Sequence, residues 1–163
     1  MPATAQRFGA DRYDELIRLL EGNDLVADFT GPELRTLAAY LLARAAEPDE
    51  ILFREGEPGD SLYLLAEGEI KMFKEGEAQD ACVVATESRL RSVGEMALLD
   101  GEPRSATCVA TRASRLLVLK REAFERLCAE RPGLALKLVQ RLARLVSRRL
   151  RMTSGRLVER LEA

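Results

Sequence analysis

The sequence predicts an α+β protein in which an antiparallel β-roll, a jelly-roll-like barrel, is flanked by N-terminal helices and a long C-terminal helix. Three observations lead to this prediction. Apolar residues recur at helical spacing before residue 50 and again after residue 120, whereas the region between them alternates with a period near two. Glycines separate the alternating runs, and many short strands joined by close-set turns are typical of a rolled or closed sheet.

The first helices are predicted from apolar spacing and from capping residues. The first ten residues form a loose arm, and residues 11–20 place apolar side chains on one helical face. A second helix begins at Thr30, because Thr30 followed by Glu33 three residues later makes a capping box. The apolar stripe of this helix continues through Leu42, so we expect the helix to end only at residues 47–49.

The middle of the chain is expected to form strands, and the end to form helices. The expected strands are residues 51–53, 61–66, 69–74, 81–85 and 116–119. A short amphipathic helix follows at residues 120–127, and a long helix runs from residue 134 to 161. We therefore divide the chain into an arm and helix (1–24), a β-roll with flanking helices (25–132) and a C-terminal lid or dimerisation helix (133–163).

Composition excludes several classes of function. The 163 residues are 47% apolar and 32% charged, which is typical of a folded domain in water. There is no apolar run of membrane-spanning length and no signal-peptide pattern, and an odd number of cysteines, three, fits a reducing cytoplasm. The chain has no histidine, which removes most zinc sites and His-based catalysis. We expect a cytoplasmic protein that is not an enzyme, with no membrane segment, metal or cofactor.

The candidate site lies at residues 93–110, where two short apolar flanks enclose a loop. Gly94, Ala97 and Ala106 keep side chains out of the way, so that backbone N–H groups can turn inward and form a nest for an anion. Small residues at these positions predict close approach of a ligand to the backbone.

Three polar residues in the same stretch complete the candidate site. Arg104 offers a planar fork of donors to a phosphate, and Ser105 adds a hydroxyl donor. Glu95 is an acceptor that can hold a sugar hydroxyl. A ligand with one negative charge beside a ribose satisfies all three. The alternative is that Glu95 and Arg104 pair with each other across a turn.

The pattern Gly-Glu-Met-Ala-Leu at residues 94–98, followed by Pro-Arg-Ser-Ala-Thr at residues 103–107, resembles the phosphate-binding cassette of cyclic-nucleotide-binding domains. This family includes domains of the catabolite activator proteins, the protein kinase A regulatory subunits and some ion channels. The resemblance covers roughly residues 25–157, and it implies a sensor of cyclic AMP, possibly of cyclic GMP. The ligand-binding residues that it implies are Gly94, Glu95, Met96, Ala97, Arg104, Ser105 and Ala106.

Two details qualify the resemblance. Ser105 stands where guanine-selective members often place a threonine, which favours cyclic AMP. Many members also have a glycine-containing turn shortly before the Gly-Glu step, but residues 86–92 contain no glycine, which leaves the shape of this hairpin open.

The C-terminal helix carries two further predictions. Apolar residues recur along it every three or four positions, close to a heptad seam, which favours a homodimer over packing on its own β-roll. Residues 148–154 resemble the catabolite activator segment whose Thr and Ser meet the adenine, which implies that Thr153 and Ser154 contact the base. This pair lies about one helical turn later than in the activator, so residues 146–150 are the alternative.

Charge is distributed unevenly between the body and this helix. Residues 133–163 hold eight Lys and Arg but two acids, whereas the rest of the chain holds 17 basic and 25 acidic residues. Our main interpretation is a solvated helix face on a sensor that signals to an unidentified effector protein. The alternative is a module that binds nucleic acid or an acidic protein through this helix. Only six residues follow Leu157, so we expect no DNA-reading domain of the activator type and do not favour nucleic acid as a partner.

Overall fold

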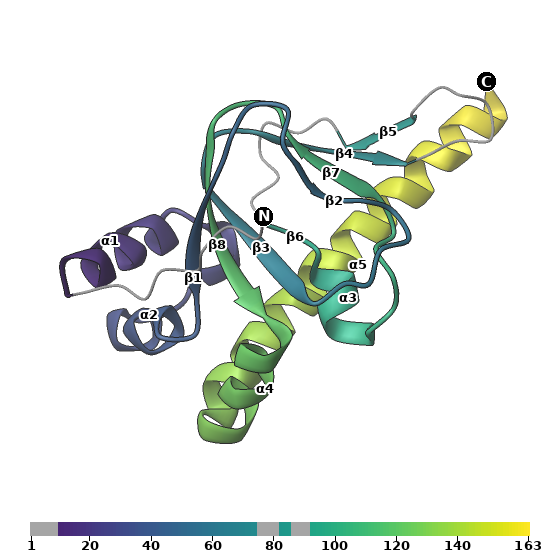
Figure 1. Cartoon of the computed structure of the whole chain (residues 1–163). Helices are drawn as coiled ribbons and strands as arrows, with labels where there is room; N and C mark the ends of the chain where they lie inside the picture. The colour runs from purple at the N-terminus through teal and green to yellow at the C-terminus, as the bar shows by residue number, and fades with distance from the viewer. Residues whose placement is uncertain (1–9, 75–81, 86–91) are drawn as a thin grey trace.

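The chain folds into two four-stranded antiparallel sheets, with helices packed against the outer face of one of them (Figure 1). This structure, a computed structural model, describes residues 10–74, 82–85 and 92–163. The predicted N-terminal arm and the glycine-free turn at 86–92 fall almost wholly outside these residues.

The strand order is β1-β8-β3-β6 in the first sheet and β2-β7-β4-β5 in the second. The expected antiparallel β-roll with flanking helices is confirmed, but the expected closure into a barrel is wrong, because among the described residues no strand of one sheet pairs with the other. Edge strands β6 and β2 are two and three residues long, so they offer few backbone groups for closure. The strands are β1 (Leu42–Ala46), β2 (Ile51–Phe53), β3 (Ser61–Glu67), β4 (Ile70–Lys74), β5 (Cys82–Ala85), β6 (Ser92–Val93), β7 (Thr107–Ala110) and β8 (Ser114–Lys120).

Helices form at both ends of the chain and once between β6 and β7. They are α1 (Ala10–Glu21), the 3₁₀ turn η1 (Asp24–Val26), α2 (Gly31–Ala38), α3 (Glu95–Asp100), α4 (Arg121–Glu130) and α5 (Pro132–Glu162). The predicted capping box opens α2, since the Thr30 hydroxyl accepts from the Glu33 amide and the Glu33 carboxylate accepts from the Thr30 amide. No helix in the described part of the chain has the length and apolar character needed to cross a bilayer.

The second helix is shorter than predicted. α2 ends at Ala38, and the segment Leu42–Ala46, expected to be helical, forms β1. Its Leu-Ala-Arg-Ala-Ala sequence has high helix propensity, but β1 pairs along its whole length with β8, from Leu42 opposite Val118 to Ala46 opposite Ser114. Long-range sheet pairing therefore overrides the local preference, a result that a short window of sequence does not reveal.

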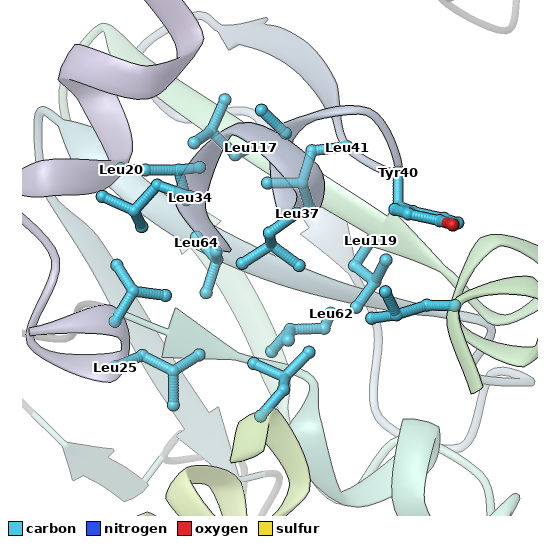
Figure 2. Packing of buried hydrophobic residues seen from close by; sticks show 14 of the residues in the cluster. Leu20, Leu25, Leu34, Leu37, Tyr40, Leu41, Leu62, Leu64, Leu117 and Leu119 are labelled. Atoms are coloured by element: carbon cyan, nitrogen blue, oxygen red, sulfur yellow. The ribbon is translucent and has the colours of Figure 1, made fainter. Parts of the chain in front are cut away.

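The central strands β3 and β8 are buried on both faces. Alternate side chains point to the helical side, where Leu62, Leu64, Leu117 and Leu119 pack with α1, α2, α4 and α5 (Figure 2). The side chains between them point to the second sheet and form a second core around Ile70. This double burial explains why β3 and β8 read as nearly continuous apolar runs.

The buried residues of the long helix α5 lie near its start. Ala135, Leu138 and Leu142 are buried against the body, whereas every residue from 151 to 163 is exposed. In Figure 1 the helix passes behind α3 and continues to the C-terminus. α5 thus extends from the core into solvent as one continuous helix.

Candidate functional site

The stretch predicted as a loop contains the short helix α3, which follows β6 directly; we call residues 94–106 the cassette. Gly94 precedes α3 with φ of +83°, in the left-handed region. A Cβ atom at Gly94 would collide with the Arg104 guanidinium and the Ser61 carbonyl. A glycine is therefore required here both by its φ angle and by the close approach of Arg104.

Arg104 is a buried cation, only 5% exposed. Its Nη1 donates to the carbonyl oxygens of Ser61 at 2.9 Å and Gly94 at 3.3 Å, and its guanidinium lies 4.2 Å from the Phe53 ring centroid. Its Nε has no hydrogen-bond partner, and no carboxylate of the described residues lies within ion-pair distance. Burial lowers the pKa of Arg104 from its ordinary value, but arginine stays protonated at neutral pH. A buried cation without a counterion calls for an anion.

The β2–β3 turn holds the backbone of Arg104 in place. The Arg104 amide donates to the Glu57 carbonyl, and the Gly56 amide donates to the Arg104 carbonyl, both at 2.8 Å. Gly59 lets the same turn lie close to α3, because a Cβ atom at Gly59 would overlap the Cβ atom of Ala97. Sequence reasoning assigned no ligand role to this turn, but the structure shows that it positions the main cation of the site.

Glu95, the first residue of α3, is 4% exposed and does not pair with Arg104, so the alternative of a mutual pair across a turn is wrong. Its Oε1 accepts from Nη1 of Arg149 on α5, whose Nη2 donates to the Ser92 carbonyl at 2.6 Å. The second oxygen, Oε2, is buried and has no partner among the described residues. One carboxylate oxygen is thus fixed by α5, and the other remains available.

Sequence reasoning missed Arg149 as a site residue, although a signal was present. Arg149 follows Leu142 by seven residues and so continues the buried stripe formed by Ala135, Leu138 and Leu142. A charged residue on the buried stripe of a helix needs a buried partner, and here that partner is Glu95.

Arg121, the first residue of α4, is a second contact that the sequence did not reveal. Its Nη2 donates to the carbonyls of Ala97 at 2.5 Å and Gly59 at 3.2 Å, and its Nη1 to that of Leu98 at 3.4 Å. A cation beside the last carbonyls of α3 is electrostatically favourable. Arg121 therefore fastens the cassette to α4, the helix that leads into α5.

The structure brings most of the predicted site residues together around one small cavity of about 40 Å³. Met96 and Ser105 are exposed and line it, whereas Ala106 is buried and is not among its lining residues. Thr153 and Ser154 are exposed on α5 and do not line it; the Thr153 hydroxyl donates to the carbonyl of Arg149. Their contact with a base stays a prediction. The cavity is lined by Phe53, Met72, Gly94, Glu95, Met96, Ala97, Arg104 and Ser105.

Comparison with known proteins shows which families this chain resembles. Residues 43–131 match the family described as "Cyclic nucleotide-binding domain". The CRP-like cAMP-activated global transcriptional regulator of Mycobacterium tuberculosis is 27% identical over 136 residues, which are 80% of this chain and 58% of that protein. The cAMP-dependent protein kinase regulatory subunit of Yarrowia lipolytica is 36% identical over 103 residues, which are 63% of this chain and 27% of that protein.

A solved structure extends the similarity over nearly the whole chain. The crystal structure of a cyclic nucleotide-binding domain from Methylobacillus flagellatus has a TM-score of 0.80 and 33% identity, covering 92% of this chain and 84% of that one. By contrast, this chain spans little more than half the length of the transcriptional regulator and about a quarter of the kinase subunit.

Proposed function

Since the chain belongs to the cyclic nucleotide-binding domain family, we propose that it is a sensor that binds cyclic AMP and signals through α5 to a partner protein. One observation supports this most directly: Arg104 Nε and Glu95 Oε2 are both buried without a partner among the described residues, and both side chains line one cavity. A ribose hydroxyl supplies a hydrogen-bond donor for Glu95, and a cyclic phosphate supplies an anion for Arg104.

In this proposal the phosphate lies against Arg104 and the backbone near Ala97 and Ala106. The ribose 2′-hydroxyl donates to Oε2 of Glu95, while Oε1 keeps its contact with Arg149. A 2′-deoxy or 2′-phosphorylated ligand would leave a buried carboxylate oxygen unpaired, so the site selects for a free hydroxyl.

We expect α5 to move when the ligand binds. The cavity of about 40 Å³ is smaller than a nucleotide, and Arg149 ties α5 to Glu95 in its wall. We propose that the nucleotide enlarges the site by shifting α5 relative to the cassette, with Arg149 and Arg121 transmitting the change. The ligand shifts this equilibrium only by its differential affinity for the two positions of α5.

We also propose a preference for cyclic AMP, a homodimer and a regulatory role. Ser105 in the cavity lining favours cyclic AMP over cyclic GMP, and the exposed apolar residues of α5 support a homodimer. The Mycobacterium tuberculosis and Yarrowia lipolytica relatives are regulators by name, so we propose a regulatory rather than a catalytic protein, acting in the cytoplasm.

Calorimetry with cyclic AMP, cyclic GMP and 2′-deoxy cyclic AMP tests the proposal. Arg104→Ala is expected to weaken cyclic AMP binding roughly 10- to 100-fold, the loss of a charge-assisted hydrogen bond. Arg156→Ala, at an exposed arginine on α5, is the matched control and should bind as the wild type does.

The 2′-deoxy nucleotide is expected to bind the unmodified chain about tenfold or more weakly, for the same reason at Glu95. This arm needs no mutation, so it remains informative if Arg104→Ala unfolds, which circular dichroism would detect. Equal binding of the two nucleotides would reject the role of Glu95, and no binding of any cyclic nucleotide would reject the proposed function.

A further inference from the structure

One face of α5 carries a line of cations that the nucleotide site does not use. We call this line the basic stripe; its members are Lys137, Arg141, Arg144, Arg148 and Arg151. They alternate by four and three residues, so they share one helical face. At 3.6 residues per turn this face lies about 130° from the buried residues of α5 and also about 130° from the apolar seam of Leu136, Ala143, Leu150 and Leu157. The basic stripe therefore stays exposed in a dimer built on that seam.

The first half of the basic stripe is already occupied by a segment of the body. Lys137 donates to the Glu33 carboxylate and the Asp28 carbonyl, both at 2.8 Å. Arg141 lies 3.4 Å from the Asp28 carboxylate and donates to the Leu25 carbonyl at 3.2 Å. Within the chain itself, Lys137 and Arg141 thus bind an acidic peptide segment with accessible carbonyls.

The second half of the basic stripe is also cationic, but no other described residue binds to it. Arg144, Arg148 and Arg151 are exposed, and none has an ion pair or hydrogen bond to the residues that the structure describes. The small side chain of Ser147 leaves a shallow hollow beside these arginines.

We propose that Arg144, Arg148 and Arg151 dock an acidic segment of a partner protein, continuing along α5 the arrangement that residues 24–33 make with Lys137 and Arg141. Carboxylates three and four residues apart on a partner helix match the spacing of the arginines, and each guanidinium presents a planar fork that fits a carboxylate. This docking does not depend on a bound nucleotide.

Charge argues for a protein partner over nucleic acid. The three free arginines span about 10 Å, at 1.5 Å per residue, so a duplex lying on them would reach well past the basic stripe. The residues before 133 hold 17 basic against 25 acidic side chains, which would repel the remaining phosphates. Residues 133–163 contain no aromatic side chain on which a single-stranded base could stack.

Fluorescence anisotropy at low ionic strength, using the full chain, tests this proposal. The probe is a fluorescein-labelled alanine-based peptide with Glu at alternating three- and four-residue spacing, and its control carries Gln at the same positions. Arg144→Gln with Arg148→Gln removes two charges from the basic stripe. Arg156→Gln with Arg160→Gln removes two from elsewhere on α5 and is the matched control, and Gln keeps a high helix propensity in both.

We expect the Glu peptide, but not the Gln peptide, to bind, with affinity falling as salt rises. The stripe variant should lose roughly three- to tenfold in affinity, as expected for two exposed ion pairs, and the control less than twofold. Equal losses in both variants, absent binding of the Glu peptide, or tighter binding of a DNA duplex than of the peptide would each overturn the proposal.

Discussion

The cassette has one arginine, Arg104, and the distal part of α5, residues 146–162, has five, and the two regions differ in how their side chains are held. In the cassette, Arg104 is fixed by the β2–β3 turn and by two carbonyl acceptors. In the distal part of α5, Leu150 is 66% exposed and Leu161 78%, and the arginines apart from Arg149 make no polar contact with the described residues.

This difference decides how precisely the structure of one chain can indicate a binding partner. Where polar groups are buried and positioned by several elements, any group left without a partner points to the chemistry of the missing ligand. Where side chains are exposed on one helix, the structure specifies a pattern of charge and apolarity but not its occupant. The cassette thus supports a ligand class, and the distal helix supports only a class of partner surface.

The largest effect is expected from a methyl group added to the cassette. Gly94→Ala should lower the free energy of unfolding by about 3 kcal/mol, combining the cost of a left-handed φ with overpacking against Arg104 and Ser61. Gly56 is the matched control: it has the same φ of 83° but nothing within 4 Å of an added Cβ. Gly56→Ala should therefore lose only about 1 kcal/mol.

Urea denaturation of both variants measures this difference. If the two substitutions have equal effects, the close approach of Arg104 to Gly94 is not a property of the folded protein, and the contrast between a tightly packed cassette and a loose distal helix fails.

The cassette could be predicted from sequence because its requirements are local. Small residues at fixed positions around one acid and one arginine are a pattern within 13 residues, and the structure buries Glu95 and Arg104 around one cavity. The capping box at Thr30 was predictable for the same reason, since both of its hydrogen bonds lie within a single helical turn.

Contacts between distant residues could not be predicted. Arg149 meets Glu95 across 54 positions, and Arg121 meets Gly59 across 62. The β1 segment, Leu42–Ala46, was misassigned because its partner β8 lies more than 60 residues away. The short helix α3 escaped prediction because a six-residue helix is stabilised by its packing rather than by its own propensity.

A second prediction concerns what covers the distal helix. Leu136, Ala143, Leu150 and Leu157 recur at intervals of seven, and all are exposed, as expected of one half of a two-stranded seam. Leu150→Gln combined with Leu157→Gln should raise the dissociation constant of the homodimer by at least about 30-fold, since burying even one leucine contributes about 2 kcal/mol and the dimer loses four.

Sedimentation velocity over a range of concentrations measures this change. Met152→Gln is the matched control, because Met152 is 51% exposed but lies on the opposite face of α5. A wild-type chain that stays monomeric at every concentration would contradict the dimer and leave another partner as the occupant of the seam.

The smallest expected effect comes from the glycine inside the distal helix. Gly155 is helical, and an added Cβ would meet nothing within 4 Å. Gly155→Ala should therefore raise the helix content and the free energy of unfolding slightly, by about 0.5–1 kcal/mol, because alanine loses less backbone entropy than glycine in a helix. The direction is opposite to that expected for Gly94→Ala, although both substitutions add one methyl group.

Residue 155 lies on the same helical face as the basic stripe, so the methyl group leaves the apolar seam unchanged. Far-ultraviolet circular dichroism and urea denaturation measure the gain. A loss of stability would mean that this surface of α5 is covered tightly in solution, and that the distal helix is packed as closely as the cassette.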